Sequence, residues 1–499
     1  MPSIMEQKSK GKKENAVSKT PKSKSLGSKN RCATRSAAIN INERLPNELL
    51  AYIFGTAIIG LLPIEHRSFL ALVCSVCEHW RDVAIEASEL WTTIYVRDPK
   101  HIPSAELFLE RSKAQLLDVD IQITFNLGVW FSSPLAASSR QYGLRVAELT
   151  SVHLWRTRTL SLCLNDAQDA EELSALYRPL SAPHLVSLSI YVGEESRSAT
   201  ILLNSICSVR SSGSEGSPLN TTPISSLTRL ELTSVYPEHE DMRRIFACSP
   251  SLETLILPKF GWGIQGKNKS IVTAPSSLRS LAVHIDFIHE IESSLAAGSC
   301  SDCCALASLR FPNLEYLEVL GDRSSYNLNL GGHFKDLPKL KTLRLQQCSV
   351  SPADTQFFCS LKLLDRLELV DNLENVVWSD GHTHKVSFPF PYLSSILISE
   401  KRRGDYNMSQ WARLARLAVN DYGCTQFSIE VTAQIYDSMA QYVGPQDEHI
   451  RVEVNDHSSG LFYLPPEDSP DEEAEEAEEA EESEEYEDHY EDDFLLFCF

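Results

Sequence analysis

The stretch PNLEYLEVL at residues 312–320 returns in altered form as PKLKTLRLQ at residues 338–346. Both copies contain an apolar residue, two variable residues, a second apolar residue, one variable residue and a third apolar residue. The alternation at the end of this pattern predicts a short strand that turns its apolar side chains to one face. A proline two residues before the first leucine suits a turn that leads into the strand.

The same pattern recurs from residue 185 to residue 398. Its copies are Leu185/Leu188/Ile190, Leu227/Leu230/Leu232, Leu252/Leu255/Leu257, Leu278/Leu281/Val283, Leu314/Leu317/Val319, Leu340/Leu343/Leu345, Leu364/Leu367/Leu369 and Leu393/Ile396/Ile398. Successive first positions lie 42, 25, 26, 36, 26, 24 and 29 residues apart. Five of these spacings are typical of leucine-rich repeats, and the two others predict repeats with insertions.

One repeat of this length cannot bury its own leucines, so neighbouring repeats are expected to stack into a solenoid. Between the strands, Asp241–Cys248 and Ala353–Ser360 have helical patterns and are expected on the return path of their repeats. Upstream, Ala105–Leu117 has the pattern of a helix and Leu117–Phe125 that of a strand. The sequence therefore predicts a region before residue 181 that caps the array.

Before the repeats, three short helices are predicted. The first begins at Leu45-Pro46-Asn47-Glu48, because proline is tolerated in a first helical turn and acids favour the positive end of the helix dipole. The second covers about Arg67–Val76 and the third about His79–Ala87. Three helices of this length form a small core, and small cores commonly need a partner.

This segment resembles an F-box, the adaptor-binding module of SCF (Skp–cullin–F-box) ubiquitin ligases. The matching residues are Leu45-Pro46, Glu48-Leu49, Ile53-Phe54, Leu72-Val73, Val76-Cys77, Trp80-Arg81, Ala84 and Leu90-Trp91. The stretch 55–66 is longer than in many F-boxes. Together with the repeats, the arrangement is similar to fungal F-box proteins with weak leucine-rich repeats.

The resemblance implies a substrate-recognition subunit that is itself no enzyme. Its partners would be a Skp-family adaptor, through it a cullin and a RING subunit, and a protein target to be ubiquitinated. The residues implied in adaptor binding are Leu45, Pro46, Glu48, Leu49, Ile53, Phe54, Leu72, Val73, Val76, Cys77 and Trp80.

The target is expected on the concave face of the solenoid. The residues between the second and third apolar positions of each repeat should point to that face. They are Ser189, Glu231, Ile256, Ala282, Glu318, Arg344, Glu368 and Leu397. This row is mixed and slightly acidic, which favours a basic or polar target.

The formal charge of the 499-residue chain is −22, and the two ends contribute unequally. Residues 1–38 carry ten basic and two acidic side chains, whereas Glu467–Asp493 carry 18 acidic and no basic ones. Neither end has enough apolar residues to fold alone. The remaining −12 disfavours a body that binds nucleic acid. Two hypotheses stay open: that the basic N-terminus is a localisation signal or a binding arm, and that the acidic segment near the C-terminus attracts basic partners.

No catalytic motif or cofactor fingerprint occurs, and no cofactor or metal is predicted. Cys74 and Cys77 are expected to pack in the helices. The cluster Cys300/Cys303/Cys304 is more simply explained as free thiols than as metal ligands. The pair His382/His384 is more simply explained as residues of an exposed loop. The longest uncharged run, Leu49–Ile64, has 16 residues and is too short for a membrane helix, which needs about 20. With no signal peptide visible, we expect a soluble protein of the cytoplasm or nucleus.

In sum the sequence predicts an α/β chain with five parts: a disordered basic tail (1–38), a three-helix F-box (39–99), a transition or capping region (100–180), a leucine-rich-repeat solenoid (181–460) and a disordered acidic tail (461–499). A second hypothesis stays open. The chain could be a non-catalytic leucine-rich-repeat scaffold or sensor, associated with chromatin through its charged ends, without a role in ligation.

Overall fold

The computed structural model describes residues 45–97, 99–122, 134–164, 172–173, 176–177, 181–196, 224–235, 237, 239–257, 270–285, 306–321, 327–328, 330–334, 336–350, 355–371, 390, 392–399, 408–455 and 460–462. The chain divides into two compact units, Met1–Leu49 and Leu50–Phe499. The basic tail, the acidic tail, the cysteine cluster at 300–304 and the pair His382/His384 lie outside the described residues.

Three helices open the described chain, as the sequence predicts. They are α1 (Asn47–Ala57), α2 (Pro63–Val76) and α3 (Glu78–Glu86), followed by the 3-10 turn η2 (Ser88–Trp91). Pro63 fits the first turn of α2 because its missing N–H would have no helical partner there. The backbone N–H of Leu62 donates to the Glu65 carboxylate at 2.8 Å and so fixes the start of the same helix.

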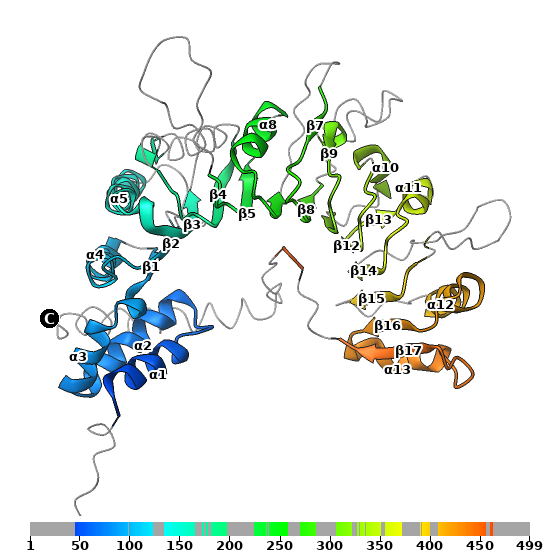
Figure 1. Cartoon of the computed structure of the whole chain (residues 1–499), viewed down its shortest axis with the longest axis horizontal. Helices are drawn as coiled ribbons and strands as arrows, with labels where there is room; N and C mark the ends of the chain where they lie inside the picture. The colour runs from blue at the N-terminus through cyan, green and yellow to red at the C-terminus, as the bar shows by residue number, and fades with distance from the viewer. Residues whose placement is uncertain are drawn as a thin grey trace, which may run out of the picture. The chain divides into compact units, whose positions relative to one another are not determined.

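A parallel sheet follows, and its main part has thirteen strands in the described residues (Figure 1). These strands are β1 (Thr93–Val96), β2 (Leu117–Gln122), β3 (Thr157–Leu164), β4 (Ser187–Ser196), β5 (Arg229–Val235), β6 (Thr254–Leu257), β8 (Ser280–His284), β10 (Tyr316–Leu320), β12 (Thr342–Gln346), β14 (Arg366–Val370), β15 (Ser395–Ser399), β16 (Phe427–Val431) and β17 (Ile450–Val454). Each strand pairs with the one before it in this series, so the sheet grows in chain order.

The pairing register brings the repeated apolar positions together. Leu281 pairs with Leu317, which pairs with Leu343 on the next strand, and Leu343 pairs with Leu367. In each of the eight predicted triplets, all three apolar side chains are buried. Neighbouring strands of the sheet therefore bury the leucines of the sequence pattern side by side.

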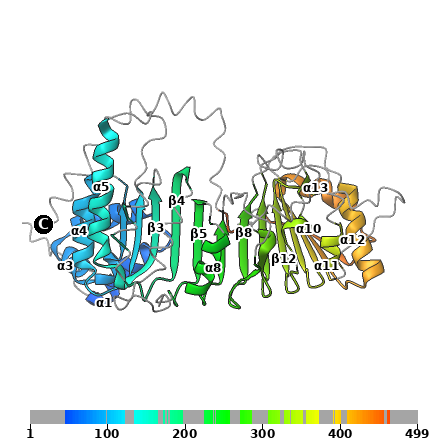
Figure 2. The same ribbon diagram turned by 90° about the horizontal axis from the view of Figure 1, so that it is seen from above.

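Helices and short strands connect the strands of the main sheet. The helices are α4 (Ile102–Arg111), α5 (Pro134–Ser151), α8 (His239–Cys248), α10 (Leu330–His333), α11 (Thr355–Ser360), α12 (Met408–Tyr422) and α13 (Ala433–Tyr442), with 3-10 turns η3 (Pro99–His101), η4 (Leu154–Arg156) and η6 (Leu306–Ser308). Two further pairs of strands are β7 (Val272–Thr273) with β9 (Leu309–Arg310), and β11 (Asn327–Leu328) with β13 (Ser349–Val350). Figures 1 and 2 show α5, α8, α10 and α12 on one side of the sheet.

The expected α/β class is confirmed, with helices at the start and a parallel sheet after them. The sheet, however, begins earlier than the sequence analysis places the repeats. The region 100–180 contributes β2 and β3, and β3 pairs directly with β4. The helices expected at Asp241–Cys248 and Ala353–Ser360 are present as α8 and α11. Within the described residues, no helix combines the length and the apolarity that crossing a membrane would need.

Candidate protein-binding sites

The first candidate site is the outer surface of the three N-terminal helices. Tyr52 is 72 % exposed and Leu72 is 61 % exposed, although both side chains are large and apolar. They are part of a group of exposed apolar side chains in this segment: Leu49, Tyr52, Ile53, Ile59, Leu61, Leu62, Ile64, Leu72 and Val76. Exposed apolar groups that gather in one short segment mark a surface that another protein covers.

The residues that the sequence analysis assigns to adaptor binding differ in their exposure. Pro46, Glu48, Leu49, Ile53, Leu72 and Val76 are exposed, Leu45, Cys77 and Trp80 are half-buried, and Phe54 and Val73 are buried. Leu72 and Val76 lie one turn apart on α2 and therefore share one face of that helix. The exposed members can contact a partner directly, whereas Phe54 and Val73 hold the helices that present them.

Buried contacts below this surface fix the helices. The rings of Phe54 and Trp80 lie 5.1 Å apart and join α1 to α3. The Arg81 guanidinium donates through Nε to the carbonyl oxygen of Cys74 at 3.0 Å, at the end of α2. This bond places a cation where the helix dipole is negative.

His66 and Trp91 connect the helices to the turn that follows them. Nε2 of His66 lies 3.0 Å from the carbonyl oxygen of Leu90, which can only accept, so this nitrogen carries the proton. Burial lowers the pKa of His66 below 6.5, against the effect of its bond to Leu90. The indole N–H of Trp91 donates to the carbonyl oxygen of Ala84 at 2.7 Å. The helical segment is thus ordered by its own hydrogen bonds.

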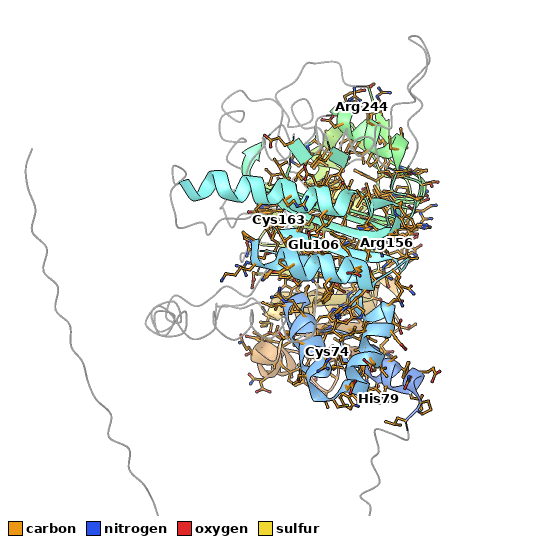
Figure 3. The ribbon with its side chains drawn as sticks, turned by 90° about the vertical axis from the view of Figure 1, so that its left-hand side faces the viewer. Cys74, His79, Glu106, Arg156, Cys163 and Arg244 are labelled. Atoms are coloured by element: carbon orange, nitrogen blue, oxygen red, sulfur yellow. The ribbon has the colours of Figure 1, made fainter. Side chains whose placement is uncertain are left out.

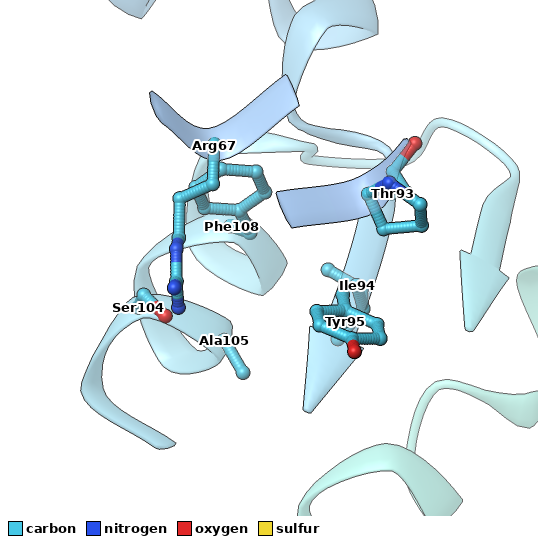
Figure 4. Close-up of a pocket in the computed structure, with 8 residues that line it drawn as sticks. Arg67, Thr93, Ile94, Tyr95, Ser104, Ala105 and Phe108 are labelled. Carbon is cyan, nitrogen blue, oxygen red and sulfur yellow. The ribbon is translucent and has the colours of Figure 1, made fainter. Parts of the chain in front are cut away.

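Trp91 also contacts the first helix of the sheet region. Its ring meets Phe108 of α4 edge to face at 4.9 Å, and the guanidinium of Arg111 lies 4.5 Å above it. Beside this contact, a cavity of about 10 Å³ is bordered by Arg67, Tyr95 and Phe108 (Figure 4). This volume admits about one water molecule, so the cavity cannot receive a small-molecule substrate.

The cysteines of the described residues differ in burial and in the pKa of their thiols. Cys74 is buried and Cys77 half-buried, and neither forms a disulfide. Burial raises the pKa of Cys163, on β3, to about 12, which keeps this thiol protonated and unreactive. Figure 3 labels Cys74 and Cys163 on different elements. Within the described ranges, no three His, Cys, Asp or Glu side chains come together in a way that could hold a metal ion.

The second candidate site is a row of residues across the sheet. All eight residues predicted to face the target pair with one another in register from β4 to β15: Ser189, Glu231, Ile256, Ala282, Glu318, Arg344, Glu368 and Leu397. Ser189 and Glu231 are half-buried, and the other six are buried. Most side chains of this row are therefore not exposed to solvent.

Side chains of alternating charge on β10, β12, β14 and β16 form ion pairs along part of this row. Arg344 lies between Glu318, whose Oε1 is 3.4 Å from its Nε, and Glu368, whose Oε2 is 2.8 Å from its Nη1. Arg366 donates to Glu368 at 2.6 Å and makes a two-pronged ion pair with Glu430 on β16. Both prongs lower the pKa of Glu430. The five groups carry a net charge of −1 and form one continuous network.

Two groups that the sequence analysis did not select complete the network. The hydroxyl of Tyr316 donates to Glu318 at 2.9 Å, and the side-chain amide of Asn455 donates to Glu430 at 2.6 Å. Tyr316 and Arg366 stand two residues before Glu318 and Glu368, so strand alternation could have placed them on the same face. Nothing in the pattern indicates the long-range contact of Glu430 with Arg366.

The comparisons with known proteins bear on the helical segment. A family model described as F-box-like matches residues 42–97, which contain α1, α2, α3 and β1. No curated protein matches the chain. F-box domains bind Skp-family adaptors, and the exposed apolar side chains described above lie within the matched residues. Residues 42–97 of this chain are an F-box-like domain.

Proposed function

We propose that this protein is the substrate-recognition subunit of an SCF ubiquitin ligase and that it has no catalytic activity of its own. The observation that supports this most is the exposure of Ile53, Leu72 and Val76 on an ordered F-box-like domain. A Skp-family adaptor would cover these side chains and remove their apolar surface from water. The adaptor would in turn connect the chain to a cullin and a RING subunit, in the cytoplasm or the nucleus.

In this proposal the parallel sheet is a leucine-rich-repeat solenoid that holds the protein target. The support is the register, which stacks the same apolar positions from strand to strand at the spacing of the repeats. Binding both the adaptor and the target raises the effective concentration of target lysines near the ubiquitin-charged enzyme. This chain would therefore contribute position and selectivity, while the bond-forming cysteine belongs to another subunit.

A titration of the full chain with purified Skp-family adaptor tests the first half of this proposal. We expect Leu72→Asp or Val76→Asp to weaken binding at least thirtyfold, which corresponds to about 2 kcal/mol for a central interface residue. Leu363→Asp is the matched control, because Leu363 is also an exposed leucine but lies outside residues 42–97. It should leave the affinity within about threefold of the wild type.

Thermal unfolding of each variant separates a binding effect from a folding effect. Leu72 and Val76 are exposed, so their aspartate variants should unfold within a few degrees of the wild type. Tight adaptor binding by a well-folded Leu72→Asp variant would contradict the proposed surface. A wild type that binds the adaptor but never a cullin would favour the scaffold hypothesis over a ligase.

A further inference from the structure

Residues 460–462 of the chain lie against the charged row of the sheet. In Figure 1 this short red segment lies on the side of the sheet opposite to α8 and α10. The backbone N–H of Leu461 donates to Oε2 of Glu318 at 2.5 Å, a contact between residues 143 positions apart in the sequence. The backbone N–H of Phe462 also bonds to the Glu318 carboxylate. The main chain, and not a side chain, therefore makes the polar contacts.

Gly460 passes so close to the row that no other residue fits in its place. A Cβ atom added to Gly460 would overlap Oε1 of Glu318 and would lie 2.7 Å from Nε of Arg344. Neither group can easily give way, because Glu318 is 0 % exposed and Arg344 is 4 % exposed. The φ angle of Gly460 is not in the left-handed region, so the requirement for glycine comes from space alone.

Other side chains of the sheet also hold the groups that receive this segment. Tyr316 donates to the same oxygen of Glu318 that accepts from Leu461. Arg344 is held on its other side by Glu368, which Arg366 holds in turn. A buried carboxylate in such a network loses little freedom when it accepts a further hydrogen bond, and this preorganisation favours binding.

We infer that Glu318 and Arg344 form a subsite for an extended peptide segment that has a glycine next to the Glu318–Arg344 pair, followed by two backbone N–H donors. The chain's own Gly460-Leu461-Phe462 occupies this subsite. A target with a matching glycine-containing segment must displace it. The inference rests on the proposed function, in which this face of the sheet receives the target.

A peptide-binding measurement on the full chain tests this inference without adaptor, cullin or target. The probe is a fluorescent peptide with the sequence of residues 457–464, HSSGLFYL. The wild type should bind it weakly, because its own segment competes. The Gly460→Val variant, whose segment cannot seat, should bind it at least about tenfold more tightly.

Two controls tie that binding to the subsite. A peptide with valine in place of the glycine should bind the Gly460→Val variant at least about tenfold more weakly than the original peptide. The double variant Gly460→Val/Glu318→Gln should lose a similar factor, because the charged acceptor for the two N–H groups is gone. Equal affinity of both peptides for the Gly460→Val variant, or no effect of Glu318→Gln, would overturn the inference.

Hydrogen exchange gives a second readout. It is measured on the wild type and so does not depend on whether a variant folds. In the wild type the Leu461 amide should exchange more slowly than an unprotected amide, because it is bonded to Glu318. Exchange at the unprotected rate would overturn the inference even if the Gly460→Val chain were unstable. Adaptor binding is independent of both readouts, so a failure of this inference can be told apart from a failure of the proposed function.

Discussion

Arg156 is a buried cation that completes the end of a helix. Its side chain is 1 % exposed and donates to the carbonyl oxygens of Leu109 and Gln115 and to the hydroxyl of Ser112, each at 3.0 Å. Leu109 and Ser112 lie at the end of α4, where backbone carbonyls have no helical partner. Figure 3 labels Arg156 beside this region. Burial lowers the pKa of Arg156, which shows that the protein carries a desolvation cost for this capping interaction.

Replacement of Arg156 by methionine should lower the free energy of unfolding by about 3 kcal/mol, because several buried acceptors lose a charged donor at once. Arg158→Met is the matched control. Arg158 pairs with Asp118 but its side chain is 50 % exposed, so the loss should be at most about 1 kcal/mol. Urea unfolding of both variants measures the difference. Equal losses would mean that Arg156 does not cap α4.

His66 makes the stability of the F-box-like domain depend on pH. Its folded pKa lies below 6.5 and its unfolded pKa near 6.5, so between these values the unfolded chain binds more protons. The free energy of unfolding should therefore be highest above pH 6.5 and fall as the pH drops below it, by at most about 1.4 kcal/mol per pH unit.

A His66→Gln variant separates this contribution from others. Glutamine can still donate to Leu90 but does not titrate, so the decline between pH 7.5 and 5.5 should become shallower. Some decline should remain, because burial also lowers the pKa of His153. Fluorescence of Trp80 and Trp91 during urea unfolding at several pH values measures the slope. An unchanged slope in the variant would contradict the assigned role of His66.

At the scale of elements, the leucines of the repeat pattern stabilise the sheet by packing between strands. Leu343 is 0 % exposed and pairs with Leu317 and Leu367 on the neighbouring strands. Leu343→Ala should lower the free energy of unfolding by about 2–5 kcal/mol. Leu363→Ala is a matched control that should cost about 0.5 kcal/mol or less, because Leu363 is 49 % exposed. Equal effects would contradict the buried register.

The repeat pattern predicted most strands of the sheet but not its ends. The first apolar position would be residue 426 before β16 and residue 449 before β17, and these are Gln and His. Asp447, two residues before that position, is bound by Arg416 of α12 at 2.8 Å. At the other end, Trp91 takes the first position before Ile94 and Val96. A pattern based on leucine could not identify these strands.

At the scale of the whole molecule, local sequence predicted the three N-terminal helices but did not separate the exposed Leu72 from the buried Val73 in the predicted adaptor-binding set. The charge network could not be predicted, because Arg366 and Glu430 are 64 residues apart and lie on β14 and β16. The same holds for the contact of Leu461 with Glu318. Such pairs depend on the number of strands between the two residues, which the sequence shows only where the apolar pattern is regular.

The proposed function requires that the chain join an SCF complex through its F-box-like domain. Co-purification of the full chain from cells, followed by detection of the Skp-family adaptor and of a cullin, tests it most directly. Wild type should capture both proteins together, and Ile53→Asp should lose both, because Ile53 is 49 % exposed on α1. A folded wild-type chain that captures neither, or an Ile53→Asp variant that captures both, would contradict the claim.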